Sequence, residues 1–309
     1  MHRYIAKRLF LLIFVVIGVS FMIYFIMDLA PGDLASSILG DGASEEEYAA
    51  LRKELGLDRP VVVRYLNYMW DLLHGDLGYS QTYKMDVMEL YMQRLPATML
   101  LALSATIVAT VLSIPIGVYA ALKRGTIEDN IVSAISVFGL AAPNFWVGLM
   151  LIIMFALNLG LFNSSGFESW KDVILPAITV GTGHMALVTR TTRSSMIDVL
   201  KQDYLMLARA KGVKERKVIT KHALKNALIP IITVTGIQFT GSLGGSTITE
   251  TVFTWPGVGR LVINAIKAQD VEVVTGSIIM TAMITSCILL VVDILYAFVD
   301  PRIKAQYSK

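Results

Sequence analysis

Apolar residues along this chain gather in long runs. Residues 9–27 form the first run, 19 residues without a charged side chain, and about 20 helical residues are needed to cross the hydrocarbon core of a bilayer. Five more runs follow, at 95–122, 131–157, 173–189, 227–249 and 273–299. The pattern therefore predicts an all-α polytopic membrane protein with six transmembrane helices.

Two of these runs have features beyond simple apolarity. The fourth is short and contains Gly181, Gly183 and His184, which favours a helix that is buried in the bundle or partly broken. The first follows a basic N-terminus in the manner of a signal peptide, but its apolar core exceeds the roughly 7 to 15 residues of a cleavable signal. We expect an uncleaved membrane anchor there.

Composition supports a membrane protein and excludes several other classes. Of the 309 residues 55% are hydrophobic and 17% charged, and the mean hydropathy is +0.62, which is too apolar for an average soluble enzyme. The net charge of +3 gives no reason to expect nucleic-acid binding. Cys287 is the one cysteine of the chain, so an intramolecular disulfide and a cysteine-clustered metal site are excluded.

Basic residues are distributed unevenly between the two sides that six spans define. With the N-terminus inside, the inner segments hold 18 of the 27 Lys and Arg residues, ten of them from Arg190 to Lys225. Six of the other nine lie in the long segment 28–94, and long translocated loops largely escape the positive-inside rule. The bias predicts that both termini are cytoplasmic.

This orientation divides the chain into three parts. Residues 1–27 form the N-terminal tail and first transmembrane helix, residues 28–94 an external segment, and residues 95–309 a five-helix core with a cytoplasmic loop at 190–225.

The external segment carries its own helix signals. Ser44 and Glu47 have the spacing of a capping box, and Gly56 stands where the helix that they begin should end. Residues 61–73 then indicate a second helix, apolar enough to lie on the membrane surface or against the bundle. The segment is either a docking surface for an external partner or a solvated cap that links two spans.

The inner loop also has a helical pattern. Ser195 and Asp198 offer a start signal, apolar residues recur at helical spacing after them, and Gly212 interrupts the pattern before it resumes at Val213. We therefore expect two helices hinged at Gly212 on the cytoplasmic face. Positive-inside bias and anionic lipid explain the basic charge, but not this helix, glycine, helix arrangement.

Catalytic motifs are absent from the sequence. It contains no GxxxxGK[ST] phosphate loop, no HExxH pair, no GxSxG elbow and no GxGxxG with an acidic partner. The four histidines fall in four different segments, so they predict no metal cluster. We expect a non-catalytic chain whose energy comes from an ion gradient or from a partner that binds nucleotide. The signal for a gradient-driven carrier is thin, because His184 is the one ionisable residue expected deep in the membrane.

Ten segments resemble one family, the inner-membrane permease subunits of ATP-binding-cassette (ABC) importers for dipeptides, oligopeptides and nickel. The segments are RYIAKRL from Arg3, LAPGD from Leu29, LGLDRP from Leu55, GDLGYS from Gly75, RLPATMLLA from Arg94, APNFW from Ala142, ARAKGV from Ala208, HALKNALIP from His222, ETVFTWPGVGR from Glu250 and DPR from Asp300. The chain resembles the first of the two permeases of such systems, the one with a long external segment after span one. The resemblance implies the type I importer permease fold, in a bacterial or archaeal cell membrane.

The resemblance gives the inner loop a role. In such permeases a short helix followed by a glycine docks in a groove of the ATPase subunit, and the matching residues here are Leu207, Ala208, Arg209, Ala210, Lys211 and Gly212. Small residues permit close approach of helices, and Arg209 and Lys211 would supply polar contacts. Met206 and Leu207 stand where the general importer consensus has Glu and Ala, so an acidic contact is not expected at Met206.

The resemblance also marks an outer turn after the fifth span, at Glu250, Trp255, Pro256, Gly257 and Gly259. Pro256 and the two glycines do not continue a helix comfortably, so the chain should turn there. The turn is either structural or a docking point for a partner. Beyond it, Val271 and Glu272 follow Asp270 where the family commonly has Tyr and Pro, so the local geometry is not carried over.

The implied partners are a second homologous permease, two ABC ATPases that bind ATP and Mg, an extracytoplasmic substrate-binding protein and the lipid bilayer; this chain itself would hold no cofactor. Polar residues in broken or small-residue-rich spans are the candidates for the substrate path: Asn144, His184, Gln238, Ser242 and Thr247. For each, an interhelical hydrogen bond is the alternative role. Di- or oligopeptides are the expected cargo; nickel or another small solute within the family, a gradient-driven secondary transporter and a membrane scaffold are the alternatives.

Overall fold

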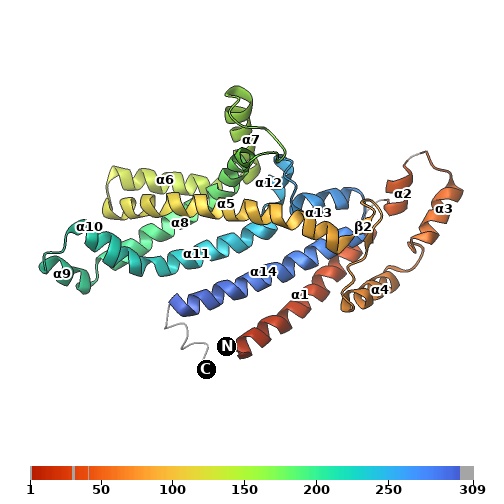
Figure 1. Cartoon of the computed structure of the whole chain (residues 1–309), viewed down its shortest axis with the longest axis horizontal. Coiled ribbons are helices and arrows are strands. Elements are labelled where there is room, and N and C mark those ends of the chain that lie inside the picture. Colours follow the sequence, from red (N-terminus) through yellow and green to blue (C-terminus); the bar gives the residue numbers. More distant parts are fainter. Residues whose placement is uncertain (1, 30–31, 41, 300–309) are drawn as a thin grey trace. The chain divides into compact units, whose positions relative to one another are not determined.

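The computed structural model describes residues 2–29, 32–40 and 42–299. These residues form helices and a two-stranded antiparallel hairpin (Figure 1). In chain order the elements are α1 (His2–Leu29), α2 (Leu34–Leu39), α3 (Glu45–Glu54), α4 (Val61–Leu73), β1 (Tyr79–Ser80), β2 (Met85–Asp86), α5 (Val87–Leu122), α6 (Ile127–Ala141), α7 (Asn144–Leu151), the π-helix η1 (Ile152–Asn158), the 3-10 helix η2 (Trp170–Val173), α8 (Ile174–Leu200), α9 (Asp203–Ala210), α10 (Glu215–Lys217), the π-helix η3 (Val218–Ala223), α11 (Leu224–Gly245), α12 (Thr247–Val252), α13 (Val258–Lys267) and α14 (Val271–Val299).

Five stretches in the described chain are long and apolar enough to cross a membrane, at Phe10–Leu29, Val87–Leu122, Trp170–Leu200, Glu215–Gly245 and Val271–Val292. They correspond to the first, second, fourth, fifth and sixth predicted spans. The second begins before the predicted residue 95, and the fourth extends well beyond residue 189.

The third predicted span is not a straight helix. It consists of α6 and the α7–η1 helix, which meet at an angle of 104°. Pro143 stands at the break, and Ala142 before it is extended with ψ at 124°, because the proline ring disfavours the helical conformation of the preceding residue. The pair makes a sixth span only if its bent halves are counted together.

The helices divide into two compact units. One comprises the described residues 99–255 and 287–299, and the other 2–98 and 256–286. Helices α5 and α14 contribute to both. The units therefore do not follow the predicted three-part division of the chain.

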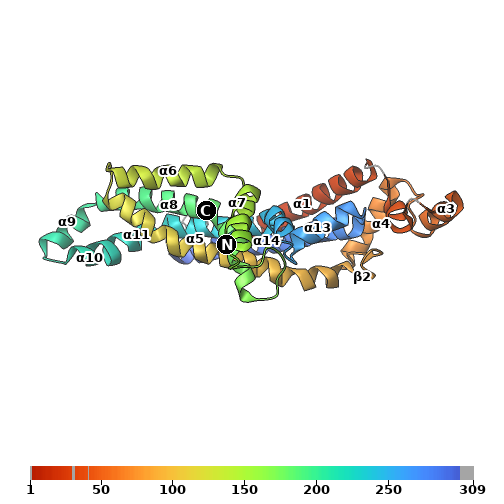
Figure 2. The same cartoon turned by 90° about the horizontal axis from the view of Figure 1, so that it is seen from above.

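In the first unit α8 is the central helix, with α6 and α11 running beside it (Figures 1 and 2). Small residues allow α5 to approach α8 closely: a Cβ added at Gly117 would lie 2.6 Å from Cβ of Thr192, and one at Gly181 would lie 3.2 Å from the carbonyl oxygen of Ala105. Such close approach is the usual basis of helix packing in membranes. The unbroken α8 also corrects the predicted helix start at Ser195 and Asp198, since both lie inside α8.

In the second unit the predicted cap helices are confirmed. Ser44 accepts a hydrogen bond from the Glu47 amide at 3.3 Å and Glu47 accepts one from the Ser44 amide at 2.9 Å, so α3 begins with the expected capping box. The chain leaves α3 through Gly56 with φ at +66°, and α4 covers Val61–Leu73 as predicted. The apolar face of α4 packs with α1 and α14 around Tyr24, Tyr65 and Tyr68.

Candidate functional site

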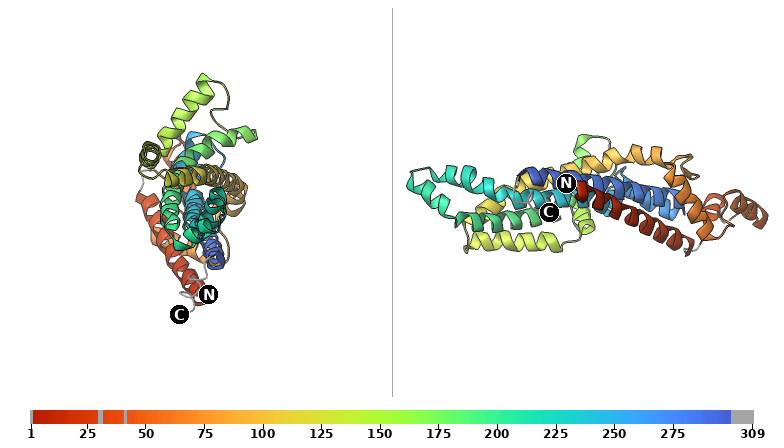
Figure 3. Two further views of the ribbon diagram at one scale, coloured as in Figure 1. Left: turned by 90° about the vertical axis from the view of Figure 1, so that its left-hand side faces the viewer. Right: turned by 90° about the horizontal axis from the view of Figure 1, so that it is seen from below.

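Helix α9 and the turn that follows it protrude from the ends of α8 and α11 (Figures 1 and 3). Asp203 in the first turn and Arg209 in the last suit the helix dipole. One side chain anchors the helix: Leu205 is fully buried in a cluster with Met196 and Val218. Ala208 is half-buried against the same cluster, so α9 is held to its own chain by one face.

The opposite face of α9 is apolar and open. Met206 is 59% exposed and Leu207 57% exposed, although exposed positions of short helices usually carry polar residues. Ala210 and Lys211 are exposed as well. An apolar helix face surrounded by lysines and arginines can pack into a groove of a partner protein.

Gly212 ends this helix in a left-handed conformation, with φ at +75° and no atom within 4 Å of the place that a Cβ would occupy. The amide of Val213 donates to the Ala208 carbonyl at 3.2 Å and the amide of Gly212 to the Arg209 carbonyl at 2.9 Å, which is the Schellman arrangement. The expected break at Gly212 between two helical segments is therefore confirmed, and α10 follows it at Glu215.

Arg209 is engaged within the chain. Its Nε and Nη2 donate to the Glu215 carboxylate at 3.1 and 2.8 Å, and this hydrogen bonding raises the pKa of the Arg209 guanidinium. This bidentate contact between Arg209 and Glu215 joins the residues on either side of Gly212. Sequence reasoning missed Glu215, although opposite charges on either side of a helix-ending glycine are a readable signal.

Tyr204 makes a second brace for α9. Nδ2 of Asn226 donates to the Tyr204 hydroxyl at 2.7 Å, and the hydroxyl lies 3.4 Å from the His222 carbonyl oxygen. These contacts join the start of α9 to η3 and α11. Together the two sets of contacts tie α9 to α10, η3 and α11.

Two of the predicted path residues meet in the first unit. The Ser242 hydroxyl on α11 lies 3.3 Å from Nε2 of His184 on α8 and donates to the Gln238 carbonyl oxygen at 2.9 Å. Nδ1 of His184 is buried without a hydrogen-bond partner. Asn144 and Thr247 lie elsewhere, at the starts of α7 and α12, so the structure brings together the side chains of His184 and Ser242. Gln238 contributes only its backbone carbonyl, one turn before Ser242 on the same helix.

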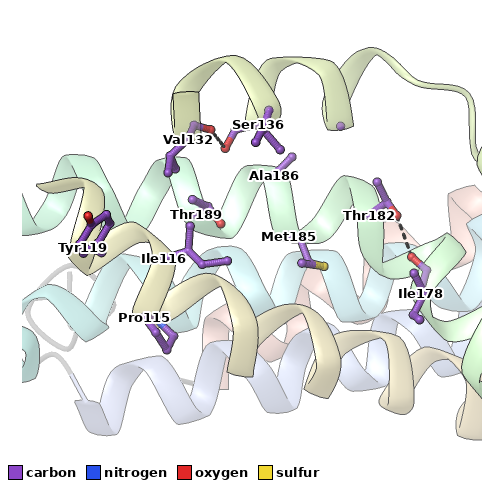
Figure 4. Close-up of a pocket in the computed structure, with 12 residues that line it drawn as sticks. Pro115, Ile116, Tyr119, Val132, Ser136, Ile178, Thr182, Met185, Ala186 and Thr189 are labelled. Atoms are coloured by element: carbon purple, nitrogen blue, oxygen red, sulfur yellow. Dashed lines mark hydrogen bonds between the residues drawn. The ribbon is translucent and has the colours of Figure 1, made fainter. Parts of the chain in front are cut away.

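A groove of about 690 Å³ lies between α5, α6 and α8 and holds none of the predicted path residues (Figure 4). Its walls are mostly apolar, among them Ile116, Val132 and Met185. The hydroxyls of Ser136 and Thr182 are used by their own helices, since they donate to the carbonyls four residues earlier at 2.8 Å each. The groove thus offers little that would bind a polar solute.

The predicted outer turn is packed into the protein. Glu250 and Trp255 are fully buried, Gly257 is buried, and Pro256 and Gly259 are half-buried. The Trp255 ring lies 4.5 Å from the ring of Phe167, and its amide donates to the Glu250 carbonyl at 2.8 Å. Because Glu250 and Trp255 have no exposed surface, the structure gives them a packing role and supports no direct partner contact by these two side chains.

No group of three or more His, Cys, Asp and Glu side chains with the geometry of a metal site occurs in the part of the chain that the structure describes. The described structure has two main features: a helical membrane bundle, and helix α9, which is braced by hydrogen bonds and has an open apolar face.

Comparison with known proteins shows the family to which the chain is related. Residues 113–305 match the model of the binding-protein-dependent transport system inner membrane component, and residues 1–102 match the N-terminal model of the same membrane components. The oligopeptide transport system permease protein AppB of Bacillus subtilis is 40% identical, over 98% of this chain and 100% of that protein. The dipeptide transport system permease protein DppB of Escherichia coli and the glutathione transport system permease protein GsiC of Salmonella typhimurium are each 38% identical, over 98% of this chain and 99% of theirs.

The fold agrees with this assignment. A chain of the MetNI methionine ABC transporter in an inward-facing conformation superposes with a TM-score of 0.59, covering 69% of this chain and 97% of that one at 18% identity. At this identity the likeness shows the fold alone. The matches over both parts of the sequence show that the chain belongs to the family of inner-membrane components of binding-protein-dependent transport systems.

Proposed function

We propose that this chain forms one half of the translocation pore of an ATP-driven importer for di- or oligopeptides. The observation that carries the proposal is the identity of 38 to 40% over 98% of the chain with permeases named for dipeptides and oligopeptides. The other half is a second permease of the same kind, and an extracytoplasmic binding protein delivers the cargo. The three-part division stays part of the proposal, with 1–27 as tail and first span, 28–94 external, and 95–309 as pore core.

The energy of ATP binding and hydrolysis reaches the spans through α9. ATP and Mg bind to two ATPase subunits on the cytoplasmic side, and the exposed face of Met206 and Leu207 lies in a groove of one of them. Closure of the ATPases displaces α9, and the Arg209–Glu215 and Tyr204–Asn226 contacts transmit this movement to α10 and α11. The spans then pass from inward-facing to outward-facing, because ATP-bound partners bind the second state better.

The coupling role is tested on the purified complex in liposomes, by ATPase activity stimulated with cargo-loaded binding protein. Leu207→Glu places a charge on the exposed docking face, and we expect a loss of about 10-fold or more in stimulated activity. Gly212→Pro is expected to do the same, because proline cannot adopt φ at +75° and removes the amide that caps Arg209. Ala208→Glu is a poorer probe, since Ala208 packs against its own chain.

Gly125→Ala is the control. Gly125 has φ at +80° and its amide donates to Asp129. Alanine strains this backbone conformation but keeps the amide, in a turn remote from α9 in sequence, so stimulated activity should survive. Leu207→Glu and Gly212→Pro complexes that assemble normally and keep full stimulation would contradict the coupling role. Uptake by the purified chain alone would instead support a gradient-driven carrier.

A further inference from the structure

The second unit contains a pocket that none of the proposed transport roles uses. It has a volume of about 310 Å³ and lies among the end of α1, the segment after α3, α4 and the start of α14. This volume is at the lower end of the range for small-molecule sites, about 300 to 1,000 Å³. Its lining combines aromatic walls with Arg59, Asp71 and Glu272.

One wall carries a polar group with no partner. Tyr68 is 5% exposed, and its hydroxyl is buried without a hydrogen bond in the described structure. Burial, and then the carboxylates of Glu272 and Asp76, raises the pKa of this hydroxyl. Buried hydroxyls in native proteins nearly always have partners, so an unpaired one in the wall of a pocket indicates a missing ligand atom.

Glu272 lines the same pocket as this hydroxyl. Its side chain packs on Gly78, where a Cβ would come within 2.9 Å of Cγ of Glu272, and Gly78 has φ at +88°. The glycine therefore makes room for the glutamate. No described residue forms an ion pair with Glu272, because Arg64 in the same pocket is held by Asp28 at 3.0 Å.

A positively charged side chain also lines the pocket. Arg59 is exposed, lines the same pocket, and pairs with no acid among the described residues. The pocket thus offers a carboxylate and a phenolic oxygen for an ammonium group, and a guanidinium for a carboxylate. A free short peptide carries both groups.

We propose that this pocket binds a short zwitterionic peptide, with its ammonium group at Glu272 and Tyr68 and its carboxylate at Arg59. The site is separate from the pore and would hold cargo at the external cap. The choice of a peptide over another zwitterion rests on the proposed peptide import; the two charges themselves come from the pocket.

The test measures equilibrium binding of radiolabelled dialanine to the purified transporter complex, without ATP and without binding protein. We expect saturable binding that weakens about 10-fold or more in Glu272→Gln, since a charge-assisted hydrogen bond is lost. Tyr68→Phe and Arg59→Gln should each weaken it severalfold. N-acetyl-dialanine lacks the ammonium group, so it should bind the wild type weakly. The Glu272→Gln substitution should not weaken its binding further.

Asp58→Asn is the control, because Asp58 is exposed and adjacent to Arg59 but does not line the pocket; its binding should equal that of the wild type. No saturable dialanine binding, or equal binding by wild type, Glu272→Gln and Arg59→Gln, would overturn the proposal. In a separate measurement of the affinity for the binding protein, a Glu272→Gln substitution that weakens this affinity but leaves dialanine binding unchanged would also overturn the proposal, and would assign the pocket to a basic side chain of that partner. Peptide uptake is assayed separately, so failed uptake with intact dialanine binding counts against the proposed function alone.

Discussion

At the scale of single residues, the contact between His184 and Ser242 is the polar pair that we propose for the cargo path. It joins α8 to α11 at 3.3 Å, while Nδ1 of the ring is buried and unpaired. The His184 ring therefore has a hydrogen-bond partner at Nε2, on α11, and none at Nδ1. Interhelical hydrogen bonds of this kind contribute about 1 kcal/mol.

We predict that His184→Ala lowers the rate of peptide uptake severalfold and leaves the order of preference among peptides unchanged. The reason is that the substitution removes a hydrogen bond between two spans, while in the proposed importer the binding protein selects the cargo. Uptake of a panel of labelled peptides by proteoliposomes measures both quantities. His184→Gln, which keeps a hydrogen-bonding group, is expected to recover part of the rate; a changed order of preference would show instead that His184 contacts cargo.

At the scale of elements, one buried ion pair fixes α6 against α8. Asp129 is 2% exposed; it accepts two hydrogen bonds from Arg193, with Nη2 at 2.7 Å from Oδ2, and a third from the Gly125 amide at 2.9 Å. Arg193 is 29% exposed on its side chain. Removing one partner of such a pair leaves the other charge unpaired in the protein.

Arg193→Ala is therefore expected to destabilise the protein by about 3 kcal/mol, toward the lower end of the range for buried pairs because Arg193 is partly hydrated. Thermal unfolding of the protein in detergent measures the loss. Glu128→Gln is the control, since Glu128 is the neighbouring residue of α6 and its pair with Lys123 spans 4.0 Å at the surface. That variant should unfold close to the wild type; equal losses in both variants would contradict a special role for the buried pair.

At the scale of the whole molecule, the distribution of basic residues predicts which parts of the chain face the cytoplasm. In a Cys287→Ser background, Lys53→Cys in α3 and Lys214→Cys before α10 each place one thiol at an exposed position. We predict that an impermeant maleimide labels Lys53→Cys in right-side-out membrane vesicles and labels Lys214→Cys only after the membrane is opened. The opposite pattern would reverse the orientation and remove α9 from the side of the ATPases.

The same scale shows which parts of the site the sequence predicted. The Ser44 capping box, the helix at 61–73 and the left-handed turn at Gly212 follow from signals within a few residues of one another, and all three are present. The Ser195 start signal was wrong because α8 continues through it. Tertiary packing overrides local capping preferences when a long helix has a buried face on which to continue.

By itself, the sequence determined the membrane class, the order of the apolar runs, the family and the helix-ending Gly212, because each depends on composition, period or short spacing. The tertiary structure decided that Trp255 and Glu250 are buried, that Asp129 meets Arg193 and that Tyr68 lies in the same pocket as Glu272. These residues are many positions apart along the chain. Their charges and hydroxyls acquire partners, or lack them, only when helix packing brings them together and removes water, and no local pattern encodes that step.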